Sequence, residues 1–269
     1  MIYVISDLHG YPHERFLALL DKAGFAEDDF LYILGDVADR SGDGGTATLQ
    51  WLLYQTNVQL ILGNHEAMLL GCAFVFEEIR EDFEEKLTAE KFDMLQRYMA
   101  DGGDVTLKAM QGLSGDEQQD ILEYLRDCPL YETLRIDEKD FILVHSGLGD
   151  FSPKRHIEDY SMEDLLWTRP ELTDEYYKNI LTVFGHTPTF SLEINIKTRS
   201  SGLRPGLLSI WEPASAENLY SSGSMIWQSS EWVHNEREVG EERFSGGKDP
   251  ETEEYGSASR RQRNLFPVF

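Results

Sequence analysis

Short apolar runs alternate with helical patterns near the start of the chain. The runs at residues 2–6, 30–34 and 58–62 consist mainly of aliphatic and aromatic side chains, which favour strands. Between these runs, residues 11–25 and 46–55 place apolar side chains at the spacing of one helix face. The order strand, helix, strand, helix, strand predicts two consecutive βαβ units.

Residues 77–127 have a different pattern. The segment is rich in Asp and Glu, and helical periodicity extends over residues 83–99 and 117–126. We expect an acidic helical insertion between the third and fourth core strands. Two interpretations stay open: the acidic side chains discriminate against highly anionic partners, or they form an ordinary solvated helix face.

The core pattern resumes after this insertion. Apolar runs at residues 141–144 and 180–184 predict two further strands, and residues 162–166 predict a short helix between them. The signals are weaker further along, where residues 207–211 and 224–227 are short strand candidates. All these elements together predict an α/β (α+β) fold.

The last part of the chain has the composition of a disordered tail. Residues 233–269 are charged, rich in Gly, Ser and Glu, and poor in aliphatic side chains until the final positions. Such a segment cannot bury enough apolar surface to order itself. We therefore expect one domain at residues 1–232, with residues 77–127 inserted into it, followed by the tail.

The composition supports a folded core and excludes several classes of protein. The 269 residues are 41% hydrophobic and 12% aromatic, enough to fill a sizeable core. The formal net charge of −25 argues against nucleic acids or anionic membranes as partners, because both select basic surfaces. Two cysteines are too few for a disulfide scaffold.

The hydropathy of the chain predicts no membrane span. Its longest apolar stretch, residues 67–76, is well short of the roughly 20 residues that a span requires. The sequence also begins without the basic and apolar regions of a secretion signal. We therefore expect a cytoplasmic protein.

Each of the five expected strands is followed directly by side chains that can bind a metal ion. Because ligands bind outside the carboxyl ends of strands in α/β sheets, these side chains converge if the strands lie side by side. Taken alone, each such residue is more often a turn residue or a hydrogen-bonded core histidine than a metal ligand. The strings DLHG, GDVADR and GNHE nevertheless follow one another at spacings of 29 and 28 residues, which makes the joint signal strong. The residues are Asp7, His9, Asp36, Asn64, His65, His145 and His186.

The motifs SDLHG, GDVADR, GNHE, HSG and GHTP resemble those of a known family. They are similar to the phosphoprotein phosphatase branch of the calcineurin-like metallophosphoesterases. Within that branch they look most like bacterial serine/threonine phosphatases and symmetrical diadenosine tetraphosphatases. The resemblance covers residues 1–190. It implies a four-layer α/β/β/α sandwich of two mixed sheets with helices outside and the site at the strand ends.

The donor types suit a pair of divalent metal ions. Carboxylate, imidazole and amide donors without a thiolate favour Mn²⁺, Fe or Zn²⁺, and six donors are too many for one open catalytic ion. By resemblance, Mn²⁺ is the first choice, and a hydroxide bridging the two ions attacks the phosphorus atom. The resemblance assigns one ion to Asp7 and His9, the second to Asn64, His145 and His186, and the bridging position to Asp36.

The resemblance also assigns four residues that do not bind metal. His65 protonates the oxygen of the leaving group, and Asp39 orients the His65 imidazole and favours its cation. Arg40 offers a planar fork to the phosphate oxygens, and Arg169, in LLWTRP, is a second phosphate-binding arginine. For Arg169 a surface ion pair is the alternative. The two arginines and the metal ions supply local attraction for an anionic substrate despite the acidic chain.

These residues predict a phosphoesterase. We expect hydrolysis of phosphate monoesters in the manner of a serine/threonine phosphatase, because nothing in the sequence indicates a surface that stacks adenine. The alternatives are a symmetrical bis(5'-nucleosyl)-tetraphosphatase and a binding module with impaired catalysis. The expected partner is a phosphorylated substrate: a phosphoprotein, a small phosphoester or a dinucleoside polyphosphate. A metal-dependent nuclease is disfavoured by the acidic balance.

The pattern departs from the family after GHTP. The family usually continues through a strand to an Ile-Asp-Thr-Gly-like turn, and residues 191–211 do not match it. Two explanations stay open: a shifted reading frame and a divergent, functional terminus. An intact frame in the resequenced coding DNA would exclude the first.

Overall fold

Two four-stranded sheets form the centre of the molecule, which is described here from a computed structural model. The structure describes residues 1–76, 88–136, 138–170, 174 and 176–187, and the backbone of residues 207–209 and 227–228. The predicted tail at 233–269 and the start of the predicted helix 83–99 lie outside the described residues.

The first sheet has the order β3-β2-β1-β8. Strands β1 and β2 are parallel, β2 and β3 are parallel, and β8 pairs with β1 in the antiparallel direction. The parallel pairs fit the predicted βαβ units, in which helices α1 and α2 connect the strands. The bounds are β1 Ile2–Ile5, α1 His13–Ala23, β2 Phe30–Ile33, α2 Thr46–Leu52, β3 Val58–Leu60 and β8 Trp227–Gln228.

The second sheet has the order β4-β5-β6-β7. Strand β4 is antiparallel to β5, whereas β5, β6 and β7 are parallel to one another. Both sheets are therefore mixed. The bounds are β4 Tyr131–Ile136, β5 Lys139–Val144, β6 Ile180–Phe184 and β7 Leu207–Ser209.

The two sheets pack face to face over a core of aliphatic and aromatic side chains. This core joins four residues of the first sheet and its strand ends to four residues of the second. Successive side chains of a strand point to opposite faces, so the neighbouring residues of β1 point away from this core. Those neighbours, Tyr3 and Ile5, share a second buried cluster with Phe16 and Leu20 of α1. The residues between the sheets are Val4, Tyr32, Leu34, Ile61, Phe141, Leu143, Leu181 and Val183.

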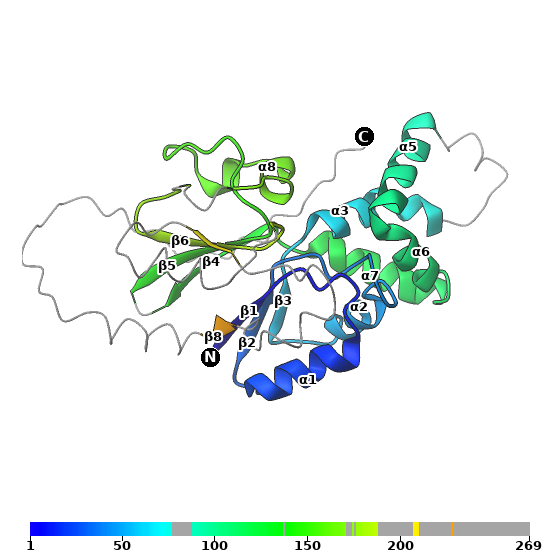
Figure 1. Ribbon diagram of the computed structural model, residues 1–269, viewed down its shortest axis with the longest axis horizontal. Helices are drawn as coiled ribbons and strands as arrows, with labels where there is room; N and C mark the ends of the chain where they lie inside the picture. The colour runs from blue at the N-terminus through cyan, green and yellow to red at the C-terminus, as the bar shows by residue number, and fades with distance from the viewer. Residues whose placement is uncertain are drawn as a thin grey trace, which may run out of the picture.

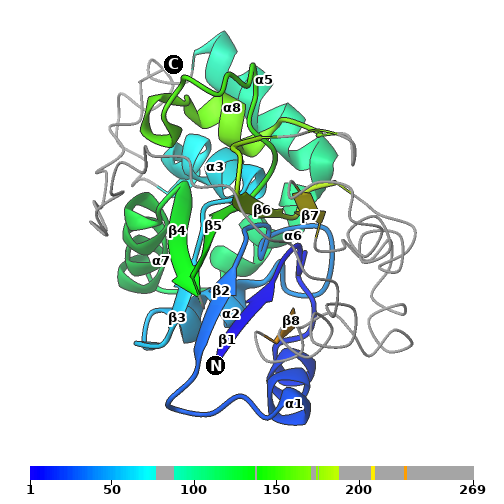
Figure 2. The ribbon, with the colours of Figure 1, turned by 90° about the vertical axis from the view of Figure 1, so that its left-hand side faces the viewer.

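Helices cover the outer faces of both sheets. Helix α1 lies against the first sheet, and the short helix α8, Met162–Leu166, lies against the second (Figure 1). The layers are visible one above another when the molecule is turned (Figure 2). This arrangement of helix, sheet, sheet and helix agrees with the expected four-layer fold.

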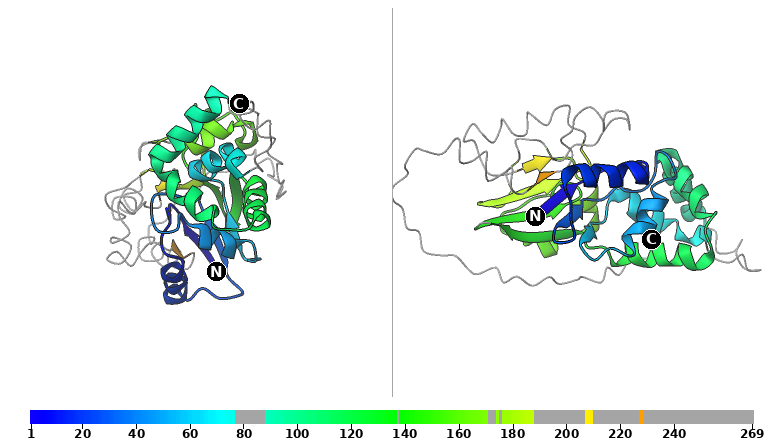
Figure 3. Two further views of the ribbon diagram at one scale, coloured as in Figure 1. Left: turned by 90° about the vertical axis from the view of Figure 1, so that its right-hand side faces the viewer. Right: turned by 90° about the horizontal axis from the view of Figure 1, so that it is seen from below.

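The described part of the acidic insertion, residues 88–127, packs into the main core. Its helices gather at one end of the sheets (Figure 3), and each buries an apolar side, with Tyr98, Leu107, Ile121 and Leu125 among the core residues. A solvated face alone therefore does not describe this segment. Its described helical elements are α5 Ala89–Tyr98, η2 Met99–Gly103, α6 Asp104–Met110 and α7 Gly115–Asp127. Before the insertion lie α3 Asn64–Gly71 and η1 Ala73–Phe76.

One strand was not expected from the sequence. Strand β4 forms an edge of the second sheet, and along it half-buried positions alternate with exposed ones from Thr133 onward. Its polar side chains weaken the apolar signal that identifies central strands.

Among the described residues, no helix has both the length and the hydropathy needed to cross a membrane.

Candidate metal centre and catalytic site

Five strand ends from the two sheets meet at one place. The loops after β1, β2 and β3 belong to the first sheet, and those after β5 and β6 belong to the second. The expected convergence therefore occurs between two stacked sheets and not along one sheet. All six predicted metal ligands are buried here: Asp7, His9, Asp36, Asn64, His145 and His186.

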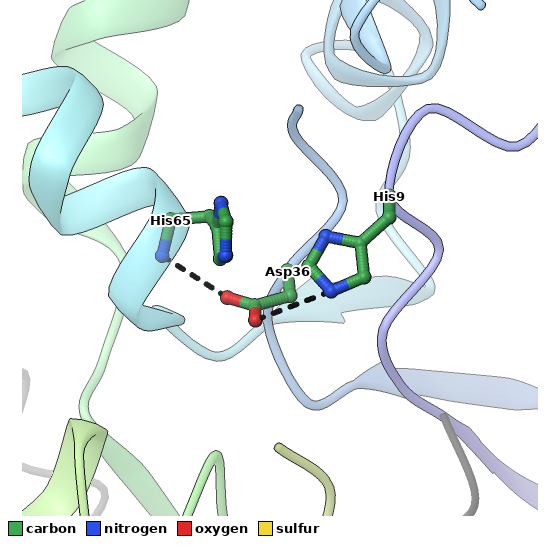
Figure 4. A group of neighbouring side chains, drawn as sticks. All are labelled: His9, Asp36 and His65. Carbon is green, nitrogen blue, oxygen red and sulfur yellow. Dashed lines mark hydrogen bonds and ion pairs between the residues drawn. The ribbon is translucent and has the colours of Figure 1, made fainter. Parts of the chain in front are cut away.

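Asp36 lies at the centre of this group. Its Oδ2 atom is 3.6 Å from Nε2 of His9, and its Oδ1 atom is 3.4 Å from Nε2 of His145. The Oδ1 atom also accepts the backbone N–H of His65 at 3.1 Å. Figure 4 shows His9 and His65 on opposite sides of the Asp36 carboxylate. The two oxygens of one carboxylate thus face two different histidines.

His145 joins the remaining donors. Its Nε2 atom lies 2.8 Å from Oδ1 of Asn64 and 3.2 Å from Nδ1 of His186. Its Nδ1 atom lies 2.6 Å from the carbonyl oxygen of Leu34, which fixes the tautomer with the proton on Nδ1. The Nε2 lone pair is therefore directed at the cluster, as in metal-binding histidines whose other nitrogen is hydrogen-bonded.

The donor atoms form two groups that share Asp36. Ligand atoms of His9, Asp36 and His65 lie within 4.8 Å of one another, and so do those of Asp36, His145 and His186. Asp7 is placed beside the second group, where its carboxylate accepts the backbone N–H of His186 at 3.0 Å. Two neighbouring groups with a common carboxylate fit a pair of divalent ions.

The electrostatics of the cluster favour bound cations. Burial, together with the nearby carboxylates of Glu66 and Asp7, raises the pKa of Asp36 well above its ordinary value. Burial, followed by the neighbouring His186, lowers the pKa of His145 well below its usual range. Neutral imidazoles are good metal ligands, and buried carboxylates need positive charge for compensation. The residues present therefore fit divalent ions.

The backbone of the site adopts a rare conformation. Nine non-glycine residues of the described chain have positive φ angles, and six of them are predicted site residues. Left-handed backbone costs free energy in residues with a side chain, and it persists where the surroundings impose it, often at functional sites. The six are Asp7, His9, Asp36, Asp39, Arg40 and His186.

Two glycines permit the close approach of neighbouring loops. Gly35 has a φ angle of +84°, and a Cβ atom there would lie 2.5 Å from Cα of Gly63. A Cβ atom on Gly63 would lie 2.3 Å from Oδ1 of Asp36. Gly63 itself has an extended backbone, so glycine is needed there for space and not for a left-handed conformation.

Glu66 has a role that the sequence analysis did not assign. Its buried carboxylate accepts the backbone N–H groups of Asp36, Ala38 and Gly63 at 2.8, 2.9 and 3.1 Å. It thus ties the loop after β2 to the loop after β3. The motif GNHE contained this residue, but the sequence could not show which donors it meets.

The expected pair of His65 and Asp39 is formed and fully buried. Nδ1 of His65 lies 2.7 Å from Oδ2 of Asp39, and Nε2 of His65 lies 3.1 Å from Nη2 of Arg40. Because an arginine can only donate, Nε2 accepts and the ring proton lies on Nδ1, facing Asp39. Asp101 approaches the same Nε2 atom at 3.7 Å.

Arg169 is exposed just after α8. Its neighbour Thr168 accepts the backbone N–H of Gly147 at 3.1 Å, which places this segment beside the loop that carries His145. Among the described residues, no hydrogen bond or ion pair joins the Arg169 side chain to the cluster, so its role as a phosphate-binding residue stays a prediction.

Comparison with known proteins gives a consistent family. A model of the family "Calcineurin-like phosphoesterase" matches residues 1–206. A symmetrical bis(5'-nucleosyl)-tetraphosphatase of Chromohalobacter salexigens is 26% identical over 188 residues, covering 69% of this chain and 58% of the relative. The protein of the same name from Nitrosomonas europaea is 31% identical over 147 residues, which cover 54% of this chain and 44% of that relative.

A solved serine/threonine phosphatase from Saccharomyces cerevisiae is 15% identical, with a TM-score of 0.45 and coverage of 78% of this chain and 66% of that chain. The chain spans about half the length of the two tetraphosphatases that it matches. The family match covers most of the chain and includes every predicted site residue. The chain belongs to the calcineurin-like phosphoesterase family.

Proposed function

We propose that this chain is a metal-dependent phosphoester hydrolase with two divalent ions. The observation that carries the proposal is the position of Asp36, whose two carboxylate oxygens face His9 and His145. Two bound ions would supply an activated water molecule and neutralise phosphate charge. Mn²⁺ is the proposed metal, held by Asp7, His9, Asp36, Asn64, His145 and His186.

The residues next to the cluster have separate proposed roles. Once Nε2 of His65 is protonated and Arg40 has turned from it to the phosphate, His65 donates that proton to the leaving oxygen. The Asp39 carboxylate at Nδ1 stabilises the imidazolium from which the proton leaves. Arg40 and Arg169 bind the phosphate oxygens. The contact between Arg40 and Nε2 of His65 supports this arrangement, because phosphate bound by Arg40 lies within reach of His65.

The favoured substrate is a dinucleoside polyphosphate cleaved symmetrically. The named relatives support this class over the phosphoprotein substrate expected from the sequence. Trp167 adds support because it is 43% exposed and adjoins Thr168, which is hydrogen-bonded to the loop of His145. An exposed indole there offers a face on which a nucleobase stacks. Phosphate monoesters are the second candidate, because the motifs also resemble those of serine/threonine phosphatases.

Turnover of three substrates tests the proposal. The Mn²⁺-loaded protein is assayed with diadenosine tetraphosphate, a phosphoserine peptide and p-nitrophenyl phosphate, and the values of kcat/KM are compared. We expect diadenosine tetraphosphate to give ADP as its product and the highest kcat/KM. A higher value for the phosphopeptide would reverse the substrate assignment. Absence of turnover with Mn²⁺, Fe²⁺ and Zn²⁺ would instead support a binding module.

A further inference from the structure

The carboxylate of Asp39 has more partners than His65. While its Oδ2 atom faces Nδ1 of His65, its Oδ1 atom accepts hydrogen bonds from the hydroxyl of Tyr98 at 2.6 Å and from Oγ1 of Thr106 at 2.5 Å. Asp39, Tyr98 and Thr106 are all fully buried. Both oxygens of the carboxylate are thus engaged, which leaves it one orientation.

The two hydroxyl donors come from the helical insertion. Tyr98 is the last residue of α5, Thr106 lies in α6, and the π-helical turn η2 separates them. Within this turn Gly102 is left-handed, and its carbonyl oxygen accepts the backbone N–H of Arg40 at 3.0 Å. The turn therefore contacts the same loop, after β2, that carries Asp39. Isolated π-helical turns of this kind are frequent at functional sites.

Close packing fixes both donors. A Cβ atom on Gly103 would lie 2.4 Å from the ring of Tyr98, and one on Gly44 would lie 2.3 Å from Oγ1 of Thr106. Thr106 also accepts the backbone N–H of Asp39 at 3.0 Å, so it contacts both the main chain and the side chain of that residue. These contacts pack the hydroxyls closely against the carboxylate.

The Tyr98 hydroxyl is suited to donation. Burial and the nearby Asp39 carboxylate raise the pKa of Tyr98 far above its ordinary value. The phenol therefore keeps its proton and remains a donor. In a low-dielectric interior, hydrogen bonds to a charged carboxylate are stronger than those between neutral groups.

We propose that Tyr98 and Thr106 are positioning residues that act through Asp39 to orient the His65 imidazole for proton donation. The inference rests on the proposed role of His65 in the phosphoesterase. With Oδ1 held by two hydroxyls, Oδ2 is directed at Nδ1 of His65. Nε2 of His65 is then left facing Arg40, the proposed phosphate-binding residue. The acidic insertion thereby contributes to the catalytic step as well as to the core.

Isosteric substitutions with matched controls test this inference. Tyr98→Phe and Thr106→Val remove one hydroxyl each, and Thr106→Ser restores a hydroxyl at that position. Tyr124→Phe is the control, because it removes a buried hydroxyl of α7 that makes no hydrogen bond to Asp39 or His65 in the described part of the chain. Three properties are measured: kcat and KM with phenyl phosphate and p-nitrophenyl phosphate, the metal content, and the downfield NMR resonance of the proton on Nδ1 of His65. This resonance is assigned by its absence from the spectrum of His65→Asn.

We expect Tyr98→Phe and Thr106→Val each to lower kcat for phenyl phosphate by about tenfold, a common cost of losing an outer hydrogen-bond partner. The loss is smaller for p-nitrophenyl phosphate, whose leaving group needs less protonation. KM and the two bound ions are retained, the His65 resonance moves upfield, and Thr106→Ser and Tyr124→Phe behave like the original protein.

Three results would overturn the inference. They are an unmoved His65 resonance in Tyr98→Phe and Thr106→Val, an equal loss for both substrates, and a Thr106→Ser variant as slow as Thr106→Val. If Tyr98→Phe does not fold, the pair of Thr106 variants decides. If the original protein hydrolyses neither of these esters nor diadenosine tetraphosphate, the proposed function fails, whereas the resonance still decides whether the hydroxyls orient His65.

Discussion

The backbone N–H of His186 donates to the carboxylate of Asp7 at 3.0 Å, although 179 residues separate them along the chain. Asp7 follows β1 of the first sheet, and His186 follows β6 of the second. The hydrogen bond therefore joins the two sheets at the metal cluster. The site exists only when both sheets are packed together, so its assembly reports on the folding of the whole core.

Replacing the central carboxylate tests its proposed bridging position. Asp36→Asn keeps the shape of the side chain and removes the negative charge that faces His9 and His145. We expect loss of bound metal and loss of turnover, measured by elemental analysis and by phosphate release. A variant that still binds two ions would contradict the bridging role of Asp36.

Replacing His65 separates proton donation from metal binding. His65→Asn is expected to retain both ions and to lower kcat by about 10²–10⁴-fold, the usual contribution of a general acid. The decrease should be smaller for p-nitrophenyl phosphate than for phenyl phosphate, because nitrophenolate leaves with less help from a proton. Equal decreases for both esters, measured by steady-state kinetics, would argue against proton donation. Loss of an ion would instead make His65 a ligand, in line with its place in one donor group.

Glu66 is expected to stabilise the fold more than any exposed acidic residue. Glu66→Gln turns an amide NH₂ towards at least one of three backbone N–H groups, and one unsatisfied buried donor costs about 1–3 kcal/mol. Urea unfolding of the metal-free protein measures this loss. Glu123→Gln, on the exposed side of α7, is the control and should change the free energy of unfolding by less than about 0.5 kcal/mol. Similar values for both variants would show that Glu66 does not hold the loops together.

Trp167 distinguishes the two substrate classes. If a nucleobase stacks on it, Trp167→Ala should raise KM for diadenosine tetraphosphate by roughly 5- to 150-fold, the equivalent of about 1–3 kcal/mol per stacked base. KM for p-nitrophenyl phosphate should stay the same, and Trp167→Phe should keep most of the affinity because it retains an aromatic ring. An unchanged KM for diadenosine tetraphosphate in Trp167→Ala would remove the stacking role.

Much of the fold and the metal cluster could be predicted from the sequence because both depend on local signals. The strands β1 and β2 are continuous apolar runs that are buried on both faces except at their first residues, and in β3 only the half-buried Gln59 interrupts the pattern. Polar ligands follow each of the three strands. The ligands Asp7, Asp36 and Asn64 follow these strands within a few residues. Their common location then follows from the geometry of parallel strands.

The remaining features depend on contacts between distant residues. The stacking of two separate sheets is set by the match of Val4 and Ile61 with side chains of the second sheet, which no local pattern specifies. Tyr98 and Thr106 meet Asp39 across 59 and 67 residues, and inside an acidic helical segment they are ordinary residues. Strand β4 was missed because an edge strand has only a weak apolar pattern.

Anomalous diffraction from crystals of the Mn²⁺-loaded protein tests the proposed pair of ions most directly. We expect two anomalous peaks that share Asp36, one beside His9 and the other beside His145, and elemental analysis giving two ions per chain. A single peak at the cluster, peaks elsewhere in the molecule, or no peak at the cluster after incubation with excess Mn²⁺ would contradict the proposed dinuclear centre.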